Sequence, residues 1–156
     1  MAAPQHALYV PRTAIEWMAE HPDLRTRHLE GTVLFADVSG FTALSERLMT
    51  EMGERGAEVV TRVMNRAFGE LVEIVLLEHG DLLRFGGDAI LVLFTGDGHV
   101  GRACRAAVDM REAIGDVETP GDPLGISIGL GTGTITADRI GQASQEIIVS
   151  GQMRRT

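Results

Sequence analysis

The chain has 156 residues, 44% of them hydrophobic and 23% charged, and this length is enough to bury a core without disulfides or metals. Its formal net charge of -8 argues against sequence-independent binding to nucleic acid, because such binding depends on Lys and Arg neutralising phosphates. The sequence has no run near the roughly 18 apolar residues of a membrane helix and no secretory signal pattern. We therefore expect a cytoplasmic protein with no membrane span in this chain.

Hydrophobic periodicity predicts that helices and strands alternate along the chain. Residues 1–30 are expected to be a lead-in with a short helix, and residues 31–156 one domain that is truncated at its C-terminal end. The predicted elements are a helix over Thr13–Glu20, a strand over Thr32–Asp37, helices over Thr42–Met52 and Ala57–Glu78, a hairpin over Leu82–Phe94 around a Gly-Gly turn, a helix over Val100–Ile114, and strands over Gly125–Gly141 and Glu146–Gly151. The order βααββαβ, followed by a further strand, favours an α+β, ferredoxin-like sandwich with its helices on one face of the sheet.

The single cysteine, Cys104, lies in an apolar helical stretch. We expect its side chain to be buried and the protein to reside in a reducing compartment.

Two acidic residues each follow an apolar strand at a glycine turn: Asp37 in FADVSGF and Asp88 in RFGGDAI. A structural interpretation is that Asp37 or Ser39 caps the next helix and that Asp88 is an ordinary hairpin residue. Alternatively, the two carboxylates converge in a ferredoxin-like order and bind a divalent cation, for which magnesium or manganese suits hard oxygen ligands. The turn over Val38–Thr42 opens a helix, whose N-terminus favours an anion. Metal and phosphate together would indicate a nucleoside triphosphate, but the spacing alone leaves both interpretations open.

Three stretches, taken together, resemble the signature segments of the class III adenylyl and guanylyl cyclases. They are FADVSGFTALSERL, LLRFGGDAILVLF and IGLGTGTITADRIG, which fall within Gly31–Gly151. The lead-in YVPRTAIEWM, with HLEGTVLFADVSGFTALSERL, is most similar to the first catalytic half of bicarbonate-responsive soluble adenylyl cyclases and their bacterial relatives. The resemblance implies the class III nucleotidyl cyclase fold.

The resemblance also implies the chemistry of the site. In that family two aspartates hold two divalent ions, Mg²⁺ or Mn²⁺, against the triphosphate while the ribose 3′-hydroxyl attacks the α-phosphorus and pyrophosphate leaves. The positions that match the metal ligands are Asp37, Asp88 and the backbone carbonyl of Val38. The positions that match the phosphate cradle are Ser39, Gly40, Phe41 and Thr42.

Three positions depart from the family pattern. Arg84 stands where the family has a base-reading lysine, Ile148 where it has a second base-reading residue, and Arg155 where it has a transition-state asparagine. The family's active sites form at a dimer interface. The resemblance therefore implies a metal-donating half of a pseudo-heterodimeric adenylate cyclase, weak or inactive alone as a homodimer. Its expected substrate is ATP in preference to GTP, and its complementary half is expected downstream.

Two alternatives remain. The domain could instead be regulatory, with Arg84 in a degenerate pocket that binds a bicarbonate-like anion effector, unless Arg84 is a buried structural partner of a carboxylate. RFGGDAI also resembles the RxGGDEF stretch of diguanylate cyclases, but Ala89 replaces the acidic residue that should follow GGD. The diguanylate cyclase interpretation is therefore remote.

Overall fold

The computed structural model describes residues 11–140, 146–151 and 154–155, and the side chains of 11–140 and 149–150. The elements are α1 (Arg12–Glu20), β1 (Thr26–Ser39), α2 (Phe41–Met52), α3 (Glu54–Leu77), β2 (Asp81–Gly86), β3 (Ala89–Thr95), α4 (His99–Gly115), β4 (Gly125–Ile140), β5 (Glu146–Gly151) and β6 (Arg154–Arg155). The strand order is β2-β3-β1-β4-β5, with β6 paired to β4 and every pairing antiparallel. This confirms the predicted α+β, ferredoxin-like fold.

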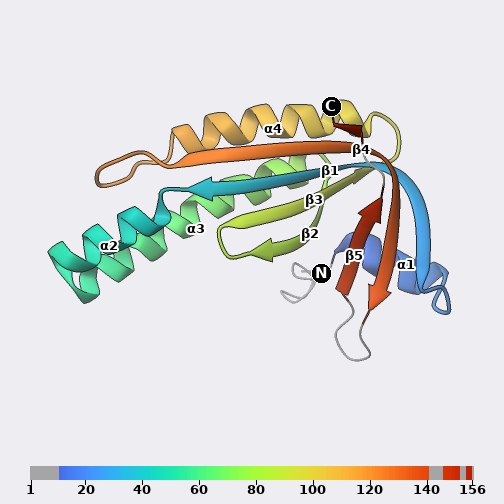
Figure 1. Ribbon diagram of the computed structural model, residues 1–156, viewed down its shortest axis with the longest axis horizontal. Coiled ribbons are helices and arrows are strands. Elements are labelled where there is room, and N and C mark those ends of the chain that lie inside the picture. Colours follow the sequence, from blue (N-terminus) through green and yellow to red (C-terminus); the bar gives the residue numbers. More distant parts are fainter. Residues whose placement is uncertain (1–10, 141–145, 152–153, 156) are drawn as a thin grey trace, which may run out of the picture.

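The main core lies between one face of the sheet and the helices α2, α3 and α4 (Figure 1). Helix α3 buries side chains that recur every three or four residues, from Val60 to Val75, which is the stripe that a core-facing helix needs. On β1 the alternate residues Leu34, Ala36 and Val38 face these helices and are 0% exposed. Since a buried aliphatic side chain contributes roughly 1.5–3 kcal/mol, this stripe fixes which face of β1 is turned inward.

Strand β1 is the centre of the sheet. It pairs with β4 along its whole length, from Thr26 opposite Asp138 to Ser39 opposite Gly125. Its other edge pairs with β3 only from Gly31 to Asp37. Strand β1 therefore runs across residue 30, the predicted boundary between the lead-in and the domain. The division of the chain into these two parts stays a prediction.

Helix α1 packs away from the main core, near β5 (Figure 1), where Trp17 and Ala14 contact Ala137 of β4. Its N-terminus is held by a residue distant in sequence. The Asp81 carboxylate, 6% exposed, accepts hydrogen bonds from the backbone N–H of Arg12 at 2.8 Å and of Thr13 at 2.7 Å. Since helix N-terminal N–H groups otherwise lack acceptors, Asp81 attaches the lead-in helix to the start of β2.

The expectation that Cys104 is buried is wrong. Its side chain is exposed, because the buried stripe of α4 runs through Ala103, Ala106 and Met110 and Cys104 lies about 100° around the helix from Ala103. None of the helices in the described part of the chain has the length and apolar character needed to cross a membrane.

Replacing Asp81 should loosen helix α1. We expect Asp81→Ala to lower the free energy of unfolding by about 1–3 kcal/mol, because two N–H groups lose a charged acceptor. Urea denaturation monitored by Trp17 fluorescence measures this. Asp116→Ala, an exposed acidic residue after α4, is the control; an equal effect of the two substitutions would contradict the role of Asp81.

Candidate functional site

The turn between β1 and α2 depends on one glycine. Gly40 has φ 103°, in the left-handed region, where a side chain would be strained. Its carbonyl accepts the Leu44 N–H at 3.0 Å, and no side chain caps α2. The interpretation in which Asp37 or Ser39 caps this helix is therefore wrong. The first turn of α2 starts directly after β1 with no capping side chain across its N-terminus.

Asp37 and Asp88 come from segments that meet at this turn. Asp37 lies opposite Ala89, the first residue of β3, and the neighbouring Val38 N–H donates to the Asp88 carbonyl at 2.9 Å. This backbone bond holds the tip of the hairpin against the end of β1. The segments that carry the two acidic residues thus meet, although their positions are 51 apart in the sequence.

Among the described residues, the two carboxylates have no protein partner that would explain them. Asp37 is half-buried and Asp88 exposed, and neither side chain makes a hydrogen bond or ion pair within the described residues. Asp81, by contrast, accepts two hydrogen bonds. No group of three or more His, Cys, Asp or Glu side chains gathers in the described part of the chain. The two carboxylates and the Val38 carbonyl are hard oxygen donors, which are the ligands that Mg²⁺ and Mn²⁺ prefer.

A groove of about 430 Å³ opens between α2, α3 and the hairpin tip. It brings together Phe41 and Thr42 of the predicted phosphate cradle with Asp88 and Gly87, but Asp37 does not line it. Ser45 and Glu46 also line it. Sequence reasoning missed both, although they lie three and four residues after Thr42 and so share its helix face.

Ser39 and Asp37 meet β4 at the other side of the turn. Ser39 lies opposite Gly125, and Asp37 lies opposite Ser127. A Cβ at Gly125 would come within 2.6 Å of the Ser39 Oγ, so a side chain at position 125 would force the Ser39 hydroxyl to move. No sequence signal pointed to Ser127, because its place beside Asp37 follows from the register of strands that are distant in the chain.

Arg84 is not the buried residue that a structural ion pair would require. It is exposed, and among the described residues it makes no ion pair. The register places it in one row across the sheet with Leu91, Phe35 and Gly129. Phe35 is 49% exposed and nothing lies within 4 Å of a Cβ at Gly129. This row therefore forms an open face of the sheet, opposite the helices.

The backbone places Ile148 on β5 opposite Asp138 and Arg155 on β6 opposite Gly131. Their side chains lie outside the described residues, so their predicted roles stay predictions.

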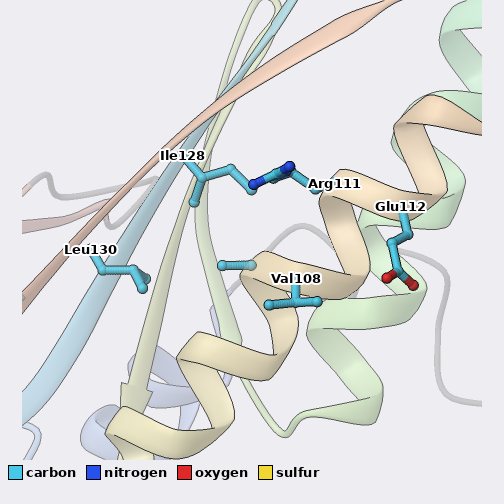
Figure 2. A pocket seen from close by; sticks show the side chains of 6 residues that line it. Val108, Arg111, Glu112, Ile128 and Leu130 are labelled. Carbon is cyan, nitrogen blue, oxygen red and sulfur yellow. The ribbon is translucent and has the colours of Figure 1, made fainter.

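A further cavity, of about 420 Å³, lies between α4 and β4. Figure 2 shows Arg111 reaching from α4 toward Ile128, while Glu112 points away from the strand. No residue of the predicted site lines it, so it belongs to a different part of the surface.

Comparison with known proteins identifies the family. The sequence model described as the adenylate and guanylate cyclase catalytic domain matches residues 25–153. The chain therefore belongs to this family, which confirms the resemblance seen in its three signature stretches.

Individual relatives agree with this assignment. Adenylate cyclase type 10 of Rattus norvegicus is 39% identical over 80 residues, which are 51% of this chain and 5% of that protein. The adenylyl cyclase CyaB of P. aeruginosa superposes with a TM-score of 0.70 at 27% identity, covering 83% of this chain and 69% of that one. The non-canonical dimeric guanylyl cyclase domain of the RhoGC fusion protein from Blastocladiella emersonii gives a TM-score of 0.67 at 28% identity, covering 81% of this chain and 70% of that one. The chain thus spans only a small part of the type 10 cyclase.

If the two aspartates serve a ligand and not the fold, their loss should leave the fold intact. We expect Asp37→Asn and Asp88→Asn to change the free energy of unfolding by no more than about 0.5 kcal/mol, as is usual for surface positions without special contacts. Urea denaturation of each variant in metal-free buffer tests this. A loss as large as that of Asp81→Ala would show that they are structural residues.

Proposed function

We propose that this chain is the metal-donating half of a class III adenylate cyclase, which converts ATP to cyclic AMP and pyrophosphate in the cytoplasm. The observation that carries the proposal is that the backbone segments bearing Asp37 and Asp88 meet. The bond from Val38 N–H to the Asp88 carbonyl joins these segments, and neither carboxylate has a hydrogen-bond or ion-pair partner among the described residues. They adjoin a glycine turn that opens an uncapped helix.

Each residue has a stated part in the proposed reaction. Asp37, Asp88 and the Val38 carbonyl would hold two divalent ions, which in such sites stabilise both the attacking and the leaving oxygen of an in-line displacement. The backbone N–H groups over Ser39–Thr42 would bind the phosphates, because a helix N-terminus favours negative charge. Gly40 allows the backbone to turn at this point, and Thr42 and Asp88 share the groove beside it.

A second cyclase domain would complete the site, either as a homodimer or as a pseudo-heterodimer. Arg84, Ile148 and Arg155 replace the residues that the family uses to read the base and stabilise the transition state, so this chain would depend on its partner for both tasks. The open sheet face around Phe35 and Gly129 offers a surface for the partner. A guanylyl cyclase domain among the similar structures, described as a non-canonical dimer, supports the pairing of two cyclase domains. Because the base-reading positions are replaced here, the preference for ATP over GTP rests on the similarity to adenylate cyclases.

A regulatory role is the second candidate, and the exposure of Arg84 favours it. A guanidinium that no described carboxylate neutralises can bind a small anion such as bicarbonate. In this case the domain would bind an effector and contribute no turnover of its own.

Cyclase turnover in the presence of Mn²⁺ separates these candidates. We expect the chain alone to be nearly inactive with ATP or GTP, and a mixture with a complementary half to form cyclic AMP. Asp37→Ala or Asp88→Ala in this chain should lower the rate of the mixture at least about 100-fold, because the metal ions lose a ligand. Asp116→Ala should have no effect.

The outcomes of this assay are distinct. Turnover by the chain alone would contradict the proposed half-site role. If neither sample turns over but the chain binds bicarbonate and Arg84→Ala abolishes the binding, the regulatory role replaces the enzymatic one.

Binding of Mn²⁺ should be visible without any substrate. A ligand at 100 times its dissociation constant that binds only the folded state raises the free energy of unfolding by about 2.7 kcal/mol. We therefore expect Mn²⁺ to raise the unfolding midpoint of the wild type and of Asp116→Ala, but not of Asp37→Ala. An equal rise in all three would place the Mn²⁺ site elsewhere.

A further inference from the structure

Three phenylalanine rings form a continuous contact beside the candidate site. The rings of Phe41 and Phe68 are stacked, with centroids 6.1 Å apart and planes at 18°. The rings of Phe68 and Phe85 meet edge to face, also at 6.1 Å, with planes at 69°. Both separations fall within the range in which aromatic pairs attract beyond their buried area. Phe68 is the shared member.

The outer two rings lie close in sequence to the two acidic residues. Phe41 is the first residue of α2 and follows Gly40 directly, four residues after Asp37. Phe85 lies on β2, three residues before Asp88. Phe68 comes from the middle of α3, an element to which no site residue was assigned. Its ring thus touches both segments that carry the acidic residues.

The hairpin tip is joined to the sheet by backbone pairing and meets the helices through the Phe85 ring. Gly87 has φ +70° with nothing within 4 Å of a Cβ built on it, and Asp88 is exposed. On the side of β1, the bond from Val38 N–H to the Asp88 carbonyl holds the tip. On the side of the helices, Phe85 is 44% exposed and rests on Phe68. Removal of the Phe68 ring would take away this support on the helix side and leave the tip attached through its backbone bonds to β1.

We propose that Phe68 is a positioning residue that fixes the distance between the Asp37 and Asp88 segments by bridging Phe41 and Phe85. This inference rests on the proposed function, in which the two aspartates bind the same pair of ions. Metal affinity depends on how well the ligands are held before the ion arrives, and loss of outer supporting contacts typically costs 10- to 100-fold. Phe68 would accordingly influence Mn²⁺ binding without touching the ion.

A merely structural role for Phe68 makes a different prediction. Phe68 and Ile74 are both partly buried residues of α3 that pack against the main core. If Phe68 only fills space, substitutions at the two positions should have the same consequences. If Phe68 positions the site, only the substitution of Phe68, and not that of Ile74, should weaken Mn²⁺ binding.

The test measures Mn²⁺ affinity by electron paramagnetic resonance of the free ion, on variants first shown to be folded by circular dichroism. We expect Phe68→Leu to weaken Mn²⁺ binding about 10-fold, and Phe68→Tyr, which keeps the ring, to retain it. Ile74→Ala should lower the unfolding midpoint with unchanged Mn²⁺ affinity. Wild-type affinity in Phe68→Leu would overturn the proposal, as would an equal loss in Ile74→Ala.

A second measurement does not depend on metal and keeps the proposal testable if Phe68→Leu fails to fold. Phe41→Leu and Phe85→Leu, alone and together, form a double-mutant cycle on the unfolding midpoint. Since Phe68 contacts both rings, we expect the changes in unfolding midpoint of the two single variants not to add up to that of the double variant. Additive changes would contradict a bridge between Phe41 and Phe85 through Phe68.

If the wild type does not bind Mn²⁺, the proposed metal role fails and the positioning role fails with it. Mn²⁺ binding that is lost in Asp37→Ala but unchanged in Phe68→Leu rejects the positioning role alone.

Discussion

The register of β1 is the constraint on which the candidate site depends. Strand β1 is paired on both edges, and Leu34, Ala36 and Val38 are fully buried under the helices. Because side chains alternate along a strand, a slip of one residue would exchange the two faces. It would turn Asp37 into the core and Val38 out of it. Burial of three apolar side chains therefore decides where the acidic residue stands, at a cost for slippage of several kcal/mol.

The same strand connects the two ends of the molecule. At its C-terminal end, the pairings with Ala89 and Ser127 bring the hairpin tip and the start of β4 to Asp37. At its N-terminal end, β1 continues to pair with β4 beyond the last partner in β3, and α1 packs there against Ala137. Asp81 then joins α1 back to β2, the strand that leads to Asp88. The lead-in helix and the candidate site are thus attached to the same hairpin.

Local signals predicted the elements well, because they depend on patterns within a few residues. The stripe of α3, the alternation on β1 and the glycines at positions 40, 87 and 125 were all visible in the sequence. What could not be predicted depends on contacts between distant segments. Cys104 lies on the solvent side of α4 because the buried stripe runs through Ala103, Ala106 and Met110, and an apolar stretch does not by itself show which side of a helix is buried. Arg84 is exposed after an irregularity in the pairing of β2 with β3, between Leu82 and Arg84, and an alternation pattern does not reveal such a shift.

The acidic residues of this chain show how a structural carboxylate differs from one that is available to a ligand. Asp81 is buried, and burying a charge is costly unless hydrogen bonds compensate for it; two helix N–H groups supply that compensation. Asp37 and Asp88 are more exposed and have no described partner, and the bond from Val38 N–H to the Asp88 carbonyl joins the segments that carry them. A cation bound by both, as the proposed function requires, would give these carboxylates the compensation that Asp81 receives from the helix N–H groups.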